Sequence, residues 1–178
     1  MSNVVLSKQT VKDGEILTDK TKDLNGNASV LDPTACEIIV RMFMPKTGVR
    51  VYNPFGGGVQ MGFVAGGCGY EYLSSEIRQN QCDANNALCQ DFPNVKWLKS
   101  DTSKFTPKQK YDLVFSCPPY YKVETYLDYD GKAPEGELNS LSTYEQFRDM
   151  LFEGYKNAIS VMNDNTFFVV MTGDSRNK

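Results

Sequence analysis

The sequence predicts an α/β domain in which a mostly parallel sheet is covered by helices on both faces. Apolar runs of strand length alternate with segments of helical periodicity, which is the order that right-handed β-α-β units produce. Several of these runs are almost entirely apolar, as parallel strands buried on both faces usually are. The 178 residues, 40% of them hydrophobic, suffice for one domain with a sizeable core.

The first helix is expected directly after an N-terminal arm. Residues 1–30 show no periodicity, and we assign the domain to residues 31–178. Asp32 is a plausible N-cap and Pro33 suits the first helical position. The helix would end before Pro45, and its apolar stripe would consist of Ala35, Ile38, Ile39, Met42 and Phe43.

Four strands are expected before residue 118, over residues 49–55, 70–77, 95–101 and 111–117. A glycine-rich turn after the first strand would open a helix. A further helix over 78–92 would place Ala84, Leu88 and Phe92 on one face.

A long acidic, tyrosine-rich loop is expected over residues 118–141, and loops of this length in a compact domain are usually functional or disordered. Ser142 and Glu145 have the spacing of a capping box at the start of the next helix. The inward face of that helix would consist of Tyr144, Phe147, Leu151, Tyr155, Ala158, Ile159 and Met162. A fifth strand is expected over 165–173, at the exposed edge of a sheet with strand order 3-2-1-4-5.

Composition excludes several classes of protein. The chain has no histidine, which argues against common zinc sites and imidazole-based triads, and we expect no metal. The five cysteines are odd in number and are expected to be reduced, as in the cytoplasm. No stretch is long and apolar enough for a membrane helix, and the net charge of −3 gives no global attraction to nucleic acid.

Polar or glycine-rich residues follow four predicted strands, where ligands bind in parallel sheets. Glu76 is placed to accept both hydroxyls of a ribose, and Asp101 to accept from an adenine amino group. The third glycine of a dinucleotide fingerprint would fall at Met61, and no Lys-Ser/Thr follows the glycines as in a P-loop. A nucleoside without phosphates therefore fits best, which points to S-adenosylmethionine.

Two motifs resemble those of a known family. The segment NPFGGGVQMGFVAGGCGYEYLSSEI resembles motifs I and II of amino-group DNA methyltransferases, and SCPPY resembles their motif IV. The segment LDPTACEIIVRMF lies where motif X precedes motif I in that family. The resemblance covers roughly residues 30–175 in the order X, I, II, III, IV, and is closest to phage-type adenine-N6 or cytosine-N4 enzymes.

The resemblance implies a Rossmann-like class I methyltransferase fold and methyl transfer from S-adenosylmethionine to an exocyclic amino group of a base flipped out of double-stranded DNA. The catalytic residues would be Cys117, Pro118, Pro119 and Tyr120, with Ser116 and Tyr121 contacting the substrate. The cofactor would contact Asp32, Pro33, Thr34, Asn53, Pro54, Phe55, Gly56, Gly58, Glu76, Ile77, Asp101 and Thr102.

The sequence departs from the family's pattern at two positions, with Asn53 where motif I usually has Asp and Cys117 where motif IV has Asp, Asn or Ser. A thiol is a poor acceptor, so Ser116, the Pro118 carbonyl or a partly ionised thiol remain as alternatives. A catalytically silent binding or assembly module, or a methyltransferase for RNA or protein amides, are alternative functions. The family's sheet continues past a fifth strand, so we expect missing C-terminal strands and a second copy or partner chain over that edge.

Overall fold

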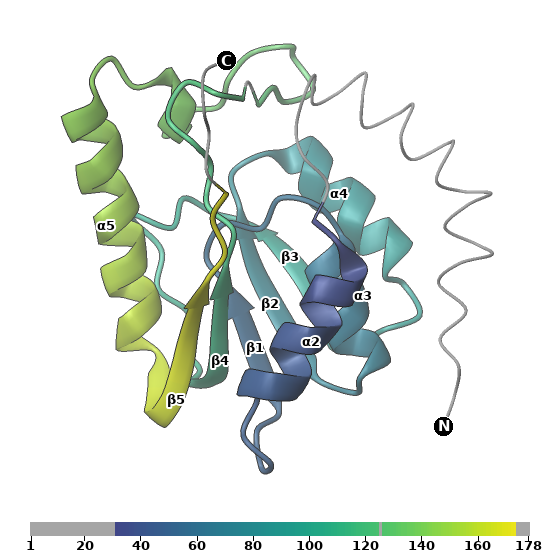
Figure 1. Ribbon diagram of the computed structural model, residues 1–178. Helices are drawn as coiled ribbons and strands as arrows, with labels where there is room; N and C mark the ends of the chain where they lie inside the picture. The colour runs from purple at the N-terminus through teal and green to yellow at the C-terminus, as the bar shows by residue number, and fades with distance from the viewer. Residues whose placement is uncertain (1–30, 125, 174–178) are drawn as a thin grey trace.

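The computed structural model describes residues 31–124 and 126–173, so the predicted arm over 1–30 lies outside the described part (Figure 1). A five-stranded sheet of order β3-β2-β1-β4-β5 forms the centre, and every neighbouring pair is parallel. This confirms the predicted fold class and strand order. The strands are β1 Arg50–Asn53, β2 Glu71–Glu76, β3 Val95–Lys99, β4 Tyr111–Ser116 and β5 Met162–Val170.

Helices cover both faces of the sheet, with α2, α3 and α4 on one face and α5 on the other (Figure 1). Each face has its own cluster of buried apolar side chains, the larger beneath α2, α3 and α4 and the smaller beneath α5. Within the described residues, no helix is long and apolar enough to cross a membrane. The helices are α2 Pro33–Phe43, α3 Gln60–Gly67, α4 Gln79–Leu88, the 3₁₀ turn η1 Leu138–Ser140 and α5 Tyr144–Ser160.

Helix α2 begins as predicted but buries only part of its apolar stripe. The Asp32 carboxylate accepts a hydrogen bond of 2.7 Å from the Thr34 N–H and caps the helix. Phe43 packs against the sheet, whereas Ile38 is 52% and Met42 69% exposed. The predicted burial of these two was wrong because each lies two residues, about 200° around the helix, from the buried Val40, on the side of α2 that faces away from the sheet.

Helix α4 buries a polar face, contrary to prediction. Ala84 and Leu88 are exposed, whereas Gln81 and Asn85 are buried. The buried amides are satisfied by hydrogen bonds, because Gln81 donates to Asn85 and Asn85 donates to the Gly57 carbonyl, both at 2.8 Å. The helix therefore contacts the glycine turn through hydrogen bonds rather than through apolar packing.

Helix α5 starts with a capping box one residue later than predicted. Thr143 is the N-cap, and its hydroxyl and the Gln146 side chain each accept from the other residue's backbone N–H. The predicted inward positions of Tyr144 and Ile159 were wrong, since these side chains are 55% and 54% exposed. Phe147, Gly154 and Ala158 are buried.

Strand β5 begins earlier than predicted and has an irregular start. Its pairing with β4 shifts between Tyr111, opposite Met162, and Leu113, opposite Phe167. Asn165 has a φ of 58° within this irregular segment. Regular pairing with β4 then continues from Phe167 to Val170. Among the described residues, β5 is the edge strand of the sheet beside β4 (Figure 1).

Candidate functional site

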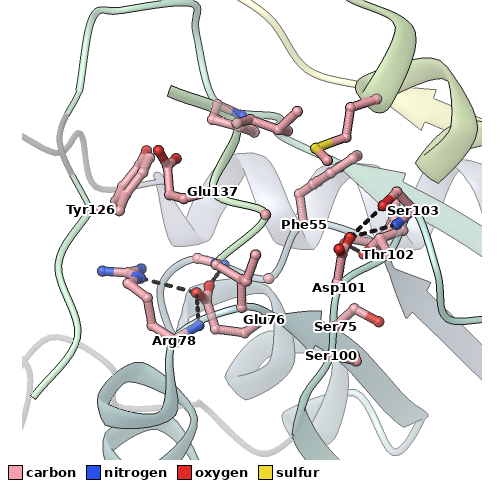
Figure 2. A pocket seen from close by; sticks show the side chains of 18 of the residues that line it. Phe55, Ser75, Glu76, Arg78, Ser100, Asp101, Thr102, Ser103, Tyr126 and Glu137 are labelled. Atoms are coloured by element: carbon pink, nitrogen blue, oxygen red, sulfur yellow. Dashed lines mark hydrogen bonds and ion pairs between the residues drawn. The ribbon is translucent and has the colours of Figure 1, made fainter. Parts of the chain in front are cut away.

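A pocket lies at the carboxyl ends of the strands, where the sequence places the site (Figure 2). It encloses about 630 Å³, including its open mouth. Of the predicted site residues, its walls include Pro54, Phe55, Gly56, Glu76, Ile77, Asp101, Thr102, Cys117 and Pro119. The exits of β1, β2, β3 and β4 therefore meet in one cavity, as expected for a parallel sheet.

Glu76, at the end of β2, is fixed by three hydrogen bonds. One carboxylate oxygen accepts from the Gly57 N–H at 2.9 Å, and the other accepts from the backbone N–H and the Nε of Arg78, both at 3.0 Å. Gly57 adopts a φ of +54°, which favours glycine and turns its N–H toward the carboxylate. The acid is 7% exposed and joins the glycine turn to the start of α4.

Asn53 lies beneath the pocket rather than in its wall. Its side-chain oxygen accepts from the Phe55 N–H at 3.0 Å, and its amide nitrogen donates to the Tyr72 hydroxyl at 3.2 Å. The side chain is 2% exposed. Asn53 therefore shapes the exit of β1, and its amide is engaged inside the protein.

Asp101, after β3, keeps one carboxylate oxygen without a hydrogen bond. Its Oδ1 accepts from the N–H and the hydroxyl of Ser103, at 2.9 and 2.7 Å. Its Oδ2 is buried and accepts no hydrogen bond from a described residue, although the exposed Lys104 ammonium lies 3.3 Å away as an ion pair. A buried acceptor with spare capacity in a pocket wall suits a ligand N–H.

Thr102 connects three elements beside Asp101. Its hydroxyl donates to the Pro54 carbonyl, and the Asn157 amide of α5 donates to the Thr102 carbonyl at 2.9 Å. Thr102 is 5% exposed. These bonds fix the exits of β1 and β3 relative to α5, so the opposite walls of the pocket are held rigidly.

The exit of β4 places Cys117 and Pro119 in the pocket wall, whereas the other predicted catalytic residues, Pro118 and Tyr120, lie outside it. Burial, with the Glu124 carboxylate adding to it, raises the pKa of the Cys117 thiol. The thiol is therefore neutral at neutral pH, and the alternative of a partly ionised thiol loses support. Ser116 is fully buried and donates to the Tyr155 hydroxyl at 3.4 Å, away from the cavity.

Tyr120 and Tyr121, which follow the two prolines, lie outside the pocket wall, and their hydroxyls bond to other parts of the protein. The Tyr120 hydroxyl accepts from the Gly173 N–H beyond the end of β5. Tyr121 donates to the Ser142 carbonyl at 3.1 Å and packs against Phe147 of α5. The predicted site residues outside the pocket wall are Asp32, Pro33, Thr34, Asn53, Gly58, Ser116, Pro118, Tyr120 and Tyr121.

The sequence reasoning missed one entire wall of the pocket. The remaining wall residues are Gly57, Ser75, Arg78, Ser100, Ser103, Tyr126, Gly136, Glu137, Leu138 and Met150. Four of them, Tyr126, Gly136, Glu137 and Leu138, come from the loop over 118–141. The length and acidity of that loop were the available signals, but neither tells which of its side chains turn inward.

Arg78 is the centre of a buried charged cluster in this wall (Figure 2). It is 3% exposed, pairs with Glu76, and its guanidinium lies 4.8 Å from the centre of the Tyr126 ring. Glu137 is 4% exposed, and burial raises the pKa of its carboxyl although Arg78 opposes the shift. The cluster therefore links the 118–141 loop electrostatically to the acid at the end of β2.

Asp128 attaches the same loop to α4. Its carboxylate accepts from the N–H groups of Gln79 and Asn80 at 2.9 and 3.0 Å, and Asn80 donates from its side chain to the Leu127 carbonyl at 3.0 Å. The helix has no side-chain cap of its own at Arg78. A residue distant in sequence thus caps α4, and the loop is fixed over the pocket.

The fold is shared with solved proteins of known class, whereas no family model and no curated protein matches the sequence. TrmN from Thermus thermophilus aligns with a TM-score of 0.59 at 13% identity, over 82% of this chain and 39% of that one. The CcbJ methyltransferase from Streptomyces caelestis aligns at 0.56 and 16% identity, over 84% and 54%.

An O-methyltransferase from a trans-AT PKS multienzyme of Brevibacillus brevis, in complex with S-adenosyl-L-homocysteine, aligns at 0.52 and 13% identity, over 96% and 47%. The fold is that of a class I methyltransferase. The chain spans between 39% and 54% of the length of these three proteins.

Proposed function

We propose that the protein is an S-adenosylmethionine-dependent methyltransferase acting on the exocyclic amino group of adenine (N6) or cytosine (N4) in DNA. The observation that carries this proposal is a single pocket that unites the acids after β2 and β3 with the Cys117–Pro119 segment after β4. The first two recognise a nucleoside, and the third has the residue order of the amino-methyltransferase motif.

The residues present fit the cofactor. The unused Asp101 Oδ2 is an acceptor for an adenine amino group, and the apolar side chains of Ile77 and Leu138 supply walls for an aromatic ring. Glu76 would accept from the ribose hydroxyls, and the N–H groups of Gly57 and Arg78 fix the direction of its carboxylate. When bound, the cofactor supplies an electrophilic methyl group on a sulfonium. A structural neighbour was solved with the demethylated product, S-adenosyl-L-homocysteine.

The chain's contribution to transfer would be to position the amino group. Pro118 and Pro119 restrict the backbone after β4, so a carbonyl in this segment keeps a fixed direction. Since Cys117 is neutral and Ser116 is buried away from the cavity, we assign the acceptor for the amino N–H to the Pro118 carbonyl. Holding the nitrogen with its lone pair toward the methyl is a proximity effect.

Tyr120 would be the surface on which the flipped base stacks. Its hydroxyl bonds to the Gly173 N–H, and this bond fixes the ring beside the end of β5. Positive charge for DNA phosphates would come from Lys104, which pairs with Asp101, and from Lys122 of the 118–141 loop. Of the other candidate lysines, Lys108 and Lys110, Lys110 lies at the opposite end of β4 and donates to the Ser160 and Met162 carbonyls.

A second candidate function, a catalytically silent binding module, is favoured by one observation. Cys117 replaces an oxygen or amide acceptor with a half-buried neutral thiol, which accepts hydrogen bonds weakly. Such a protein would bind the cofactor without transferring its methyl group. The two functions therefore share the cofactor pocket and differ at one motif position.

The first experiment is calorimetric titration with S-adenosyl-L-homocysteine of the wild type and of Asp101→Asn. The substitution keeps Oδ1 for Ser103 and replaces the spare acceptor with an NH₂ donor facing the adenine amino group. Losing one such hydrogen bond costs about 1–3 kcal/mol, so affinity should fall roughly tenfold or more. The exposed acid Asp130 provides the control Asp130→Asn, which should leave affinity unchanged.

Absence of binding by the wild type, or equal affinity in Asp101→Asn, would remove the cofactor assignment. If binding holds, transfer of labelled methyl groups to double-stranded DNA separates the two functions. Tyr120→Ala should abolish most of the transfer and leave cofactor affinity nearly unchanged. Binding without transfer to DNA would favour the silent module, and transfer to RNA or a protein amide instead would replace the DNA substrate.

A further inference from the structure

Asp101, the acid proposed to bind the adenine amino group, lies in a turn that follows β3 rather than on the strand itself. β3 ends at Lys99, and the Lys104 N–H donates to the Asp101 carbonyl at 3.0 Å, which closes a four-residue turn. The N–H and the hydroxyl of Ser103 donate to Asp101 Oδ1 at 2.9 and 2.7 Å (Figure 2). The direction of the other oxygen, Oδ2, therefore depends on where the turn lies.

One side chain of α5 holds this turn from outside. The Asn157 Nδ2 amide donates to two consecutive carbonyls, those of Thr102 and Ser103, at 2.9 and 3.1 Å. An amide nitrogen carries two hydrogens, so each hydrogen has one carbonyl as its partner. Both carbonyls belong to the backbone directly after Asp101, which Asn157 thus ties to α5.

The close approach of α5 to the turn depends on Gly154, three residues before Asn157. A Cβ on Gly154 would lie 2.8 Å from Phe55 Cζ and 3.2 Å from Thr102 Cγ2. Glycine weakens a helix relative to alanine, and residues three apart share one helix face. The same face of α5 therefore carries a glycine that admits the turn and an amide that holds it.

Asp101 Oδ2 has little room to change direction. A Cβ on Gly136 would lie 2.8 Å from this oxygen, so the 118–141 loop borders it closely. The Lys104 ammonium, 3.3 Å away, is 65% exposed and also lies 3.9 Å from Glu135, so it holds the oxygen weakly. A small shift of the turn would therefore press Oδ2 against the loop or withdraw it from the pocket.

We propose that Asn157 determines the preference of this site for an adenine ring, by holding the turn so that Asp101 Oδ2 faces an exocyclic amino group. The inference rests on the proposed function, because it takes the adenosyl cofactor as the ligand. Asn157 does not itself line the pocket, so it acts through the turn and is a positioning residue. A carboxylate accepts hydrogen bonds and does not donate them, so it selects an amino group and repels the oxo group of a hypoxanthine ring.

Selectivity of this kind depends on the geometry of the acceptor. A site that holds an acceptor opposite a ligand donor rejects the analogue without that donor, because a buried polar group is then left unpaired. An acceptor that is free to move can turn away from the oxo group, so the analogue loses less. Removing the two Asn157 hydrogen bonds should therefore lower the ratio of the two affinities, and not the affinity for the adenosyl ligand alone.

Calorimetric titration with S-adenosyl-L-homocysteine and with its oxo analogue, S-inosyl-L-homocysteine, tests the proposal. The wild type should prefer the adenosyl ligand by roughly tenfold or more, the factor expected for one hydrogen bond to a charged group. Asn157→Ala should lose most of this preference. Asn157→Asp has nearly the same shape but turns oxygen atoms toward the two carbonyls, so it should lose the preference too, whereas a role in packing alone would preserve it.

Asn163→Ala is the matched control. The Asn163 amide donates to Asp112 Oδ1 at 2.8 Å, near the start of β4 and thus at the end of the sheet opposite the pocket. This variant loses an amide hydrogen bond of the same kind, and its ligand preference should equal that of the wild type. Urea titration without ligand measures the stability of each variant, and Asn157→Ala should remain folded because alanine favours a helix.

The outcomes separate this inference from the cofactor assignment. A wild type that binds neither ligand would overturn both. A wild type that binds both ligands equally, or an unchanged preference in Asn157→Ala or Asn157→Asp, would overturn the role of Asn157 and leave the cofactor pocket standing. A folded Asn157→Ala that loses both affinities in equal proportion would make the residue structural and would overturn the proposal as well.

Discussion

Asp128→Ala should detach the 118–141 loop from α4 and weaken both the fold and the pocket. The substitution removes the acceptor of two helix N–H groups, at 2.9 and 3.0 Å, from a carboxylate that is 13% exposed. Losing an N-cap costs about 0.5–2 kcal/mol, and losing a negative charge at a helix N-terminus costs about 0.3–1 kcal/mol. The ion pair with Lys99 at 3.7 Å adds little because Lys99 is half exposed.

The free energy of unfolding should therefore fall by about 1–3 kcal/mol in Asp128→Ala. It should fall by less in Asp128→Asn, which keeps one acceptor oxygen but turns an NH₂ donor toward the other helix N–H. Urea titrations give these differences. Amide hydrogen exchange at Gln79 and Asn80 should accelerate in the Ala variant. Glu135→Ala, which removes a 97% exposed acid from the same loop, is the control and should match the wild type.

The same contact predicts a pH dependence. Burial raises the pKa of Asp128, but the N–H groups of Asn80, Gln79 and Tyr129 together with the charge of Lys99 outweigh burial and hold the pKa below its ordinary value. Its stabilising contribution is therefore present above the ordinary Asp pKa and is lost as pH falls through the lowered value. The gap between wild type and Asp128→Ala should close in that acidic range. A constant gap, or equal unfolding free energies at neutral pH, would refute the capping argument.

Three further variants test the pocket wall. Gly136→Ala forces a φ of +84° on a non-glycine residue and puts a Cβ 2.8 Å from Asp101 Oδ2, so the affinity for S-adenosyl-L-homocysteine should fall in calorimetry. The control Gly131→Ala carries similar backbone strain (φ +72°), but its Cβ meets no other atom, so this variant should bind normally. Glu137→Gln should raise the urea midpoint at neutral pH, because the raised pKa of Glu137 means that its ionised form destabilises the folded state. This gain in stability should vanish below the ordinary Glu pKa, where the carboxyl is protonated in both states. An equal gain at every pH would contradict the raised pKa. Glu76→Gln and Glu76→Ala both remove the charge that pairs with Arg78, but Gln keeps one acceptor oxygen, so it should weaken binding with a smaller stability loss than Ala. Equal stability losses would argue against the hydrogen bonds to Glu76.

The strand exits were predictable because strand length, parallel order and glycine-rich turns are local properties of the sequence. Glu76 and Asp101 both line the pocket, since Glu76 is the last residue of β2 and Asp101 follows the end of β3 by two positions. Asn53 and Ser116 were predicted to contact cofactor and substrate, but neither lies in the pocket wall. Side chains alternate between faces along a strand, so the last residue of a strand can point beneath the site rather than into it.

The buried polar surfaces could not be read from periodicity. Asn85 and Gln81 have the composition of a solvated helix face, but their burial depends on the Gly57 carbonyl that a distant turn supplies. Which residues of the 118–141 loop turn inward depends on the attachment of the loop through Asp128, whose hydrogen-bond partners lie almost fifty positions earlier in the sequence. Such contacts are set by tertiary structure, and no local pattern encodes them.

The 118–141 loop connects the two halves of the proposed reaction. It begins directly after Cys117 and the two prolines, which would hold the amino group, and returns through Glu137 and Leu138 into the wall of the cofactor pocket. Arg78 and Asp128 fix its middle to α4. A variant that frees the loop should therefore lower cofactor affinity and transfer together, whereas a change at Cys117 should alter transfer alone.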